Sequence, residues 1–106
     1  MSVPVRSDAQ RADALAAALA ARQERSRLRA ALKARDLTAA DVIDGAPGNP
    51  LWGGIRVSWL LECVPGIGSF RAERIMASLQ IAPSRRVQGL GDRQRAALLV
   101  ELANHG

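Results

Sequence analysis

The stretch VPGIGSFRAERIM at positions 64–76 limits the possible folds of this chain more than any other part of it. Pro65 cannot continue a preceding helix, while Gly66 and Gly68 permit a tight turn and carry no Cβ that would block an approaching ligand. Beyond the turn, apolar side chains recur at the spacing of one buried helix face: Ala72, Ile75, Met76 and Leu79. A shorter apolar stripe precedes the proline, made of Trp59, Leu60, Cys63 and Val64. The pattern predicts a helix, a glycine turn and a second helix.

The start of that second helix is a candidate anion site. The first backbone N–H groups of a helix have no partner within it and attract negative charge. Here they belong to Ser69, Phe70 and Arg71. Helical spacing puts Arg71, Arg74 and Ser78 opposite the apolar face, so positive charge is added where the amides point. A nucleic-acid phosphate is the expected anion, and an ordinary helix corner with a glycine cap is the alternative.

Composition and breakers predict an all-α fold. With 106 residues, 48% of them apolar and mostly Ala and Leu, the chain predicts one small domain, 1–106, of about five helices. After a leader at 1–6, a capping-box pattern at Ser7–Gln10 opens one long helix. Helices are expected at roughly 8–34, 39–44, 57–63, directly after the glycine turn, and 92–103 with Asp92 as N-cap, and a loop is expected at 46–54.

The long N-terminal helix, placed within residues 7–35, is expected to be a basic arm. Its C-terminal half would pack on the domain through Leu28 and Leu32, while its first half would project. Residues 55–103 are expected to form the core of the domain around the glycine turn. One edge of the arm is a candidate second DNA contact or a purely solvated face, and it carries Arg22, Arg29 and Lys33.

The net charge of +5 is divided between two basic zones. Residues 1–36 and 65–95 each carry a net charge of +4, and the rest of the chain is slightly acidic. This division favours a polyanion that is held by specific faces. Arg85 and Arg86 lie in a connector where neighbouring guanidiniums bind phosphate well, and we expect them and Arg56 beside the hairpin.

The second half of the chain contains a weaker copy of the glycine pattern. Gly89-Leu90-Gly91 repeats the glycine–apolar–glycine spacing before the last predicted helix, although no proline precedes it. The two copies form a pseudo-repeat, or the second is only a turn. Trp52, in the predicted loop, is expected to cover the edge of the core rather than to stack on a base.

Several function classes find no support in the residues. Cys63 is the only cysteine, so it forms no internal disulfide, and its apolar stripe predicts a buried, inert thiol. His105 has no Cys or His partner at metal-ligand spacing, and no acid–base pair stands in a recognisable motif. We therefore expect no enzyme activity, metal, cofactor or small-molecule substrate. The Ala-rich run within the arm is too short and too weakly apolar for a signal peptide or a membrane span, which predicts a cytoplasmic protein with no membrane partner.

The segment from Ile55 to Leu98 resembles the actinobacterial integration host factor of the mycobacterial and Streptomyces type. The resemblance rests on V-S-x-L-L-E-x-x-P-x-x-G up to Gly68 and on I-A-P-S-R-R-V-Q-G-L-G-D-R-Q-R at 81–95. The length and the Ala/Arg-rich N-terminal helix agree as well. It implies a helix-two-turns-helix, nucleoid-associated protein, monomeric in solution, that binds double-stranded DNA with little sequence preference and bends, bridges or compacts it.

The resemblance and the residues together give the candidate DNA-binding set. It comprises Arg56, Pro65, Gly66, Gly68, Ser69, Arg71, Arg85, Arg86 and Gln88. The family commonly has lysine where Ser69 stands, often has a basic residue at Gln88, and has a smaller residue than Phe70. Fewer charges predict weaker binding and a salt dependence that is flatter by about 0.9 in log–log slope for each phosphate that is no longer bound.

Three other interpretations compete with this one. The run GIGxxxAxxI…IxxxxRV also resembles an rRNA-binding protein of the head of the small ribosomal subunit, although the basic C-terminal tail and the shorter N-terminus of that family are missing. Some base-excision glycosylases carry a helix-two-turns-helix module, but Ser2 stands in place of their nucleophile and there is no second catalytic domain. A helical protein that binds another protein through the arm is the last interpretation, and it predicts no salt-sensitive DNA binding.

Overall fold

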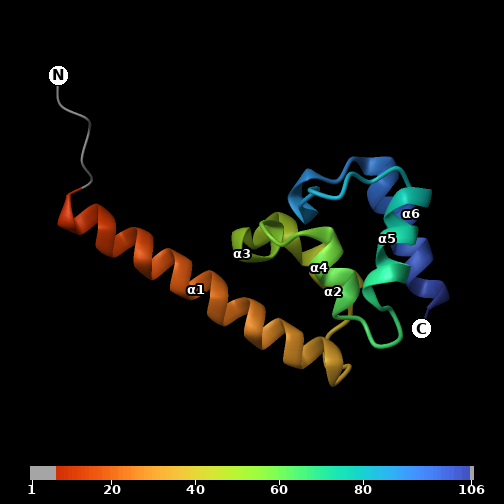
Figure 1. The fold of residues 1–106 in the computed structure, drawn as a ribbon, viewed down its shortest axis with the longest axis horizontal. Coiled ribbons are helices and arrows are strands. Elements are labelled where there is room, and N and C mark those ends of the chain that lie inside the picture. The colour runs from red at the N-terminus through yellow and green to blue at the C-terminus, as the bar shows by residue number, and fades with distance from the viewer. Residues whose placement is uncertain (1–6, 106) are drawn as a thin grey trace.

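The computed structural model describes residues 7–105, and the leader predicted at 1–6 lies outside that range. Six α-helices and two 3₁₀-helices follow one another with no β-strand among the described residues, which confirms the all-α fold. They are α1 (Asp8–Lys33), α2 (Ala39–Gly45), η1 (Ala46–Gly48), α3 (Pro50–Gly53), α4 (Val57–Glu62), α5 (Ser69–Ser78), η2 (Val87–Gly89) and α6 (Asp92–Asn104). Figure 1 shows α1 as a long rod beside a bundle of the other helices.

α1 is held by its ends and by its composition. The predicted capping box is present, because Ser7 Oγ accepts from the Gln10 amide at 3.2 Å and Gln10 Oε1 accepts from the Ser7 amide at 2.9 Å. Alanine, the best helix former, dominates the projecting half. Leu28 and Leu32 are buried in the core, whereas Leu15 is 71% exposed. The predicted long N-terminal helix is confirmed, and its projecting half raises the radius of gyration to 16.1 Å, against about 13 Å for a compact chain of this length.

The segment 46–54 is not the open loop that its glycines and prolines predicted. It contains η1 and α3, because a proline stands in the first turn of each helix and the Asn49 side chain caps the second. Asn49 Oδ1 accepts from the amides of Leu51 and Trp52 at 3.2 and 3.3 Å. A proline in the first turn of a helix lacks only an N–H that would have no partner within the helix, so these residues are compatible with helix starts.

Trp52 connects α3 to the arm. Its ring covers the edge of the core as expected, and it lies so close to Gly45 that a Cβ there would sit 2.6 Å from the ring. Its Nε1 donates to Glu24 Oε2 at 3.3 Å, and Arg27 donates to both oxygens of the same carboxylate. The hydrogen bond from Arg27 lowers the pKa of Glu24 below its ordinary value of 4.5. This contact fixes the point at which α1 leaves the bundle.

The hairpin that organises the sequence joins α4 to α5, which pack against each other. Leu60 and Leu61 of α4 are fully buried, and Ala72, at the predicted crossing, is 1% exposed. Cys63 is buried at the end of α4, as predicted, and burial raises the pKa of its thiol. A single hydrophobic cluster runs from Leu28 on α1 to Leu98 on α6, so the arm and the bundle share one core.

α6 begins one residue earlier than its predicted cap implies. Gly91, not Asp92, is the N-cap, and Asp92 is the first helical residue. Gln94 Oε1 accepts from the Gly91 amide at 3.0 Å, so the backbone N–H of the N-cap residue has a hydrogen-bond partner. The second glycine pattern therefore starts a helix, as the first does, but it has no positive φ and its cap amide is already bonded. The second pattern also differs from the first in the acidic side chain of Asp92, which stands at its helix start and disfavours an anion there.

Candidate nucleic-acid interface

Glycine stands at the two hairpin positions for different structural reasons. Gly66 has φ of +88°, a left-handed conformation that side chains other than glycine rarely adopt. Gly68 has φ of −87° and ψ of 177°, which any residue can adopt, and it is the N-cap of α5. A Cβ at either position would meet nothing within 4 Å. The fold thus requires the first glycine, whereas the second keeps space open outside the helix start.

The predicted anion cradle has its amides free. Gly68 offers no side-chain cap to α5, and within residues 7–105 no bond occupies the amides of Ser69, Phe70 and Arg71. The Arg71 side chain folds back over the turn, and its Nη1 donates to the carbonyl of Gly66 at 3.3 Å. An anion at this helix start would meet backbone N–H groups and one guanidinium together.

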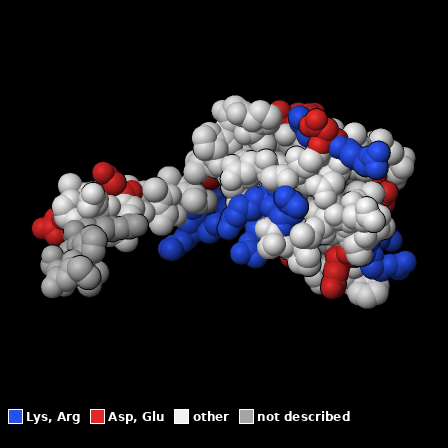
Figure 2. Space-filling model, turned by 90° about the horizontal axis from the view of Figure 1, so that it is seen from above, with Lys and Arg blue, Asp and Glu red and all other residues white. Residues whose placement is uncertain are grey.

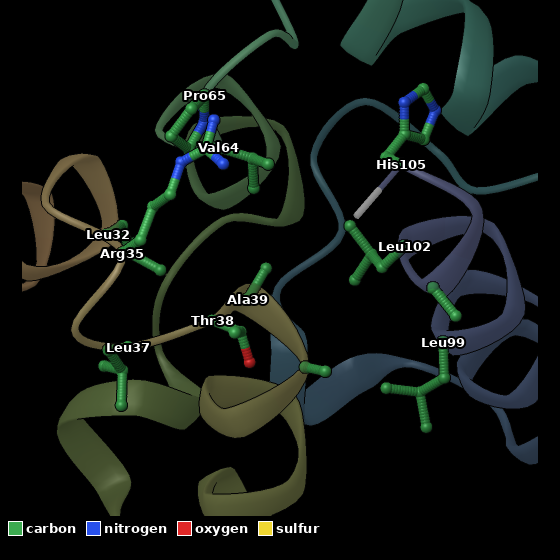
Figure 3. Close-up of a pocket in the computed structure, with 12 residues that line it drawn as sticks. Leu32, Arg35, Leu37, Thr38, Ala39, Val64, Pro65, Leu99, Leu102 and His105 are labelled. Atoms are coloured by element: carbon green, nitrogen blue, oxygen red, sulfur yellow. The ribbon is translucent and has the colours of Figure 1, made fainter.

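A second guanidinium reaches the hairpin from the α1–α2 turn. Figure 3 shows Arg35 extended towards Val64 and Pro65, on one side of an apolar pocket of about 430 Å³ whose far side is formed by Leu99 and Leu102 of α6. Arg35 has φ of 63°, a conformation that is uncommon for this residue type. The pocket itself is apolar and offers few partners to a phosphate, but its rim brings charge to the turn.

Arg56 and Arg86 face each other at the opposite end of α4 from the hairpin. The Val57 amide donates to the carbonyl of Arg85 at 3.0 Å, and the Val87 amide donates to the carbonyl of Ile55 at 2.9 Å. These bonds make Arg56 and Arg86 a non-hydrogen-bonded antiparallel pair, in which side chains stand closest. The expected position beside the hairpin is therefore corrected: the six residues of α4, about 9 Å of helix, lie between the two sites.

The paired arginines line a groove between the arm and the bundle. This groove, of about 370 Å³, is lined by no acidic residue in the described chain and receives Arg25 from α1, opposite Arg56 and Arg86. Trp59 forms part of its wall, and the guanidinium of Arg29 lies 5.5 Å from the centroid of the same ring. Figure 2 shows Lys and Arg side chains gathered on this face where the arm meets the bundle. The two basic zones of the sequence thus meet in one place.

Few of these charges are neutralised within the protein. In the described residues, ion pairs involve Arg27 with Glu24, Arg95 with Asp44 and His105 with Glu101, all outside the groove. Arg86 donates to the carbonyl of Gly54, and this bond leaves most of its five N–H donors free. Like charges placed directly opposite on paired strands destabilise a fold. A cluster kept at such a cost is typical of a functional site.

The remaining predicted DNA-binding residues lie outside both the anion cradle and the basic groove. Arg85 donates from Nη1 to the carbonyl of Gly89 at 3.1 Å and stays exposed beside Arg86. Gln88 packs on α3, since a Cβ at Gly53 would lie 3.1 Å from its Oε1. Lys33 and Arg22 are exposed on the same edge of α1 as Arg29.

Sequence reasoning missed two basic residues of this surface. Arg25 lies three residues after Arg22 and four before Arg29, so helical spacing alone places it on the same edge of the arm. Arg35 stands beyond the end of the helix, and no local pattern predicts that it turns towards the hairpin.

Residues 7–105 hold neither a cluster of metal-ligating side chains nor a helix that could cross a membrane. No three of the His, Cys, Asp and Glu side chains gather closely enough to hold a metal ion. No helix in this range combines the length and the apolar character that crossing a bilayer requires.

The helix pair joined by the glycine hairpin, together with the basic groove, defines a class of small helical nucleic-acid-binding folds. Residues 32–102 match the family described as "S13-like H2TH domain". A solved structure of sIHF bound to an 8bp palindromic DNA superposes with a TM-score of 0.76 at 44% identity, covering 80% of this chain and 96% of that one.

Curated relatives narrow the class. The integration host factor of Mycobacterium tuberculosis is 46% identical over 99 residues, which cover 93% of this chain and 94% of that protein. The integration host factor of Streptomyces coelicolor is 42% identical over 106 residues, covering 100% and 99%. The chain belongs to the integration host factor family of these actinobacteria, as its sequence resemblance implied.

Proposed function

We propose that this protein is a nucleoid-associated architectural protein that holds the backbone of duplex DNA with little sequence preference and bends, bridges or compacts it. The observation that carries the proposal is the groove in which Arg25, Arg56 and Arg86 converge with no acidic residue along it. Such a cluster is stabilised by a polyanion. The solved relative that was crystallised with DNA supports the choice of DNA.

The proposed mechanism uses two sites on the bundle. The free amides at the start of α5 take one phosphate with help from Arg71, while the groove takes others on the far side of α4. The two sites lie at opposite ends of α4, whose six residues span about 9 Å, so they would hold different phosphates. Contacts to phosphate fix the register and carry no sequence information, which gives weak sequence preference.

The arm extends this surface. Along the basic edge of α1, Arg22 lies on one side of Arg25 and Arg29 and Lys33 lie on the other, so a duplex lying in the groove would contact α1 along its length. Because α1 leaves the bundle at a fixed point, DNA that follows both parts is constrained in direction. This is the physical route by which one copy would bend a duplex. The role is binding, and no residue of the proposed site is assigned to a reaction.

The test compares charge removal in the groove with charge removal elsewhere. The double variant Arg56→Gln/Arg86→Gln should lower the log–log salt slope of DNA binding by about 1.8, since each phosphate that is no longer neutralised removes about 0.9. The loss should be uniform over unrelated duplex sequences. Arg93→Gln, an exposed arginine on α6, is the matched control. Equal slopes for the double variant and the control would exclude the groove as the DNA site.

The family description supports one alternative, an rRNA-binding role of the ribosomal small-subunit head type. The groove chemistry serves either backbone, so only the choice of nucleic acid separates the two functions. A direct comparison of the affinities for DNA and for RNA distinguishes them.

A further inference from the structure

Phe70 is the only phenylalanine of the chain, and its side chain is 72% exposed. Nothing in the core requires it, since the buried face of α5 is formed by Ala72, Ile75 and Met76. A large aromatic surface left in water loses the free energy that its burial would give. The ring is therefore not needed for the core and is available to a ligand.

The ring is presented at the proposed phosphate cradle. Phe70 is the second residue of α5, two positions after Gly68, and side chains on a helix tilt towards its N-terminus. The guanidinium of Arg74, one turn later, lies 5.8 Å from the ring centroid and supports it by a cation–π contact. The ring thus stands over the same end of the helix as the free amides.

The surroundings of Phe70 are charged rather than apolar. A shallow groove at its side is lined by Arg71, Arg74 and Ser78, and its one acidic residue, Glu101, lies 3.4 Å from His105 Nε2. A protein partner that buried Phe70 would also have to bury these guanidiniums. A nucleic acid pairs phosphates with them and offers flat bases to the ring.

We propose that Phe70 stacks on bases where the stacking of a DNA duplex is weakened, and so gives the protein a preference for gapped or bulged DNA over intact duplex. The inference rests on the proposed function, because the amides and arginines must first hold the backbone. Insertion of an apolar side chain at a base step costs less where the bases are already unstacked. Aromatic–base stacking is tolerant of sequence, which agrees with backbone-directed binding.

The experiment measures the affinity of the full chain for two DNAs of one sequence, an intact duplex and the same duplex with a two-nucleotide gap. A 2-aminopurine beside the gap reports local unstacking by its fluorescence. The variants are Phe70→Ala, Phe70→Trp, which keeps an aromatic ring, and Val100→Ala, which removes a similarly exposed apolar side chain from α6. Circular dichroism confirms that each variant is folded.

We expect tighter binding to the gapped DNA than to the intact duplex for the unchanged chain, for Phe70→Trp and for Val100→Ala. The expected ratio is about 5- to 150-fold, which corresponds to about 1–3 kcal/mol of stacking. Phe70→Ala should bind the gapped and the intact DNA with equal affinity and should cause no change in the 2-aminopurine fluorescence. Equal affinity of the unchanged chain for both DNAs would overturn the stacking proposal while leaving the proposed function intact. Binding to neither DNA would overturn both. A preference that survives Phe70→Ala would refute the role of the ring and point to a protein partner for it.

Discussion

Replacing Gly68 by alanine separates what the hairpin needs in order to fold from what it needs in order to bind. The backbone at Gly68 is in an ordinary extended conformation and a Cβ there meets nothing within 4 Å. The only structural cost is a poorer N-cap, about 0.5–1 kcal/mol, against a typical stability of about 5–15 kcal/mol. The variant should remain folded with a slightly lower melting temperature.

The effect on DNA binding should be much larger. The new methyl group stands in the space through which a phosphate reaches the amides of Ser69, Phe70 and Arg71. Hydrogen bonds to a charged group contribute about 1.5–3 kcal/mol, so removing them should weaken binding by about 10- to 150-fold. The log–log salt slope should fall by about 0.9 because one phosphate fewer is held.

Gln88→Ala is the comparison variant for this prediction. Gln88 is neutral and packs on α3, so it contributes at most one ordinary hydrogen bond to a phosphate, about 0.5–1.5 kcal/mol, and its loss should cost about 2- to 10-fold. Affinities and salt slopes are measured by fluorescence anisotropy with a labelled duplex, alongside thermal unfolding. If both variants lose the same affinity while folded, the amide cradle is not the phosphate site.

Two further predictions concern the contact that fixes the arm. Gly45→Ala would place a Cβ 2.6 Å from the ring of Trp52 and should destabilise the protein by about 1–3 kcal/mol. In the control variant Gly48→Ala, the new Cβ meets nothing within 4 Å and should not destabilise the protein. The melting temperatures of the two variants test this prediction, and equal values would contradict the packing of Trp52 on Gly45. The pKa of Glu24 is lowered in the folded protein, chiefly by Arg27, so its contribution to stability is complete above pH 4.5 and is lost as the pH falls through the folded-state value. Glu24→Gln should therefore flatten the decline of stability in urea unfolding below pH 4.5, and an unchanged pH profile would count against that contact.

Much of this fold was predictable because its determinants are local. The capping box at Ser7, the alanine run after it and the glycine hairpin each act within a few residues, and the structure has α1 and the helix pair where these patterns put them. The segment 46–54 was mispredicted because the same prolines that end one helix start the next when Asn49 caps it.

Part of the candidate site is likewise determined by local sequence, and part depends on residues far apart in the chain. The free amides after Gly68 follow from a helix start with no side-chain cap, which the sequence displays directly. The pairing of Arg56 with Arg86 depends on η2 returning to the start of α4 from far along the chain, and no short pattern encodes that return. The approach of Arg25 depends in turn on where Trp52 holds the arm.

The most direct test of the proposed function is the affinity of the full chain for a random-sequence DNA duplex and for a structured RNA of equal length, at several salt concentrations. The proposed DNA-binding role predicts tighter binding to the duplex DNA than to the RNA, and phosphate binding by the hairpin and by Arg25, Arg56 and Arg86 predicts a log–log salt slope of about −3 or steeper. Tighter binding to the RNA would favour the ribosomal alternative. Binding to neither, or binding that does not respond to salt, would contradict the claim that this surface holds a DNA backbone.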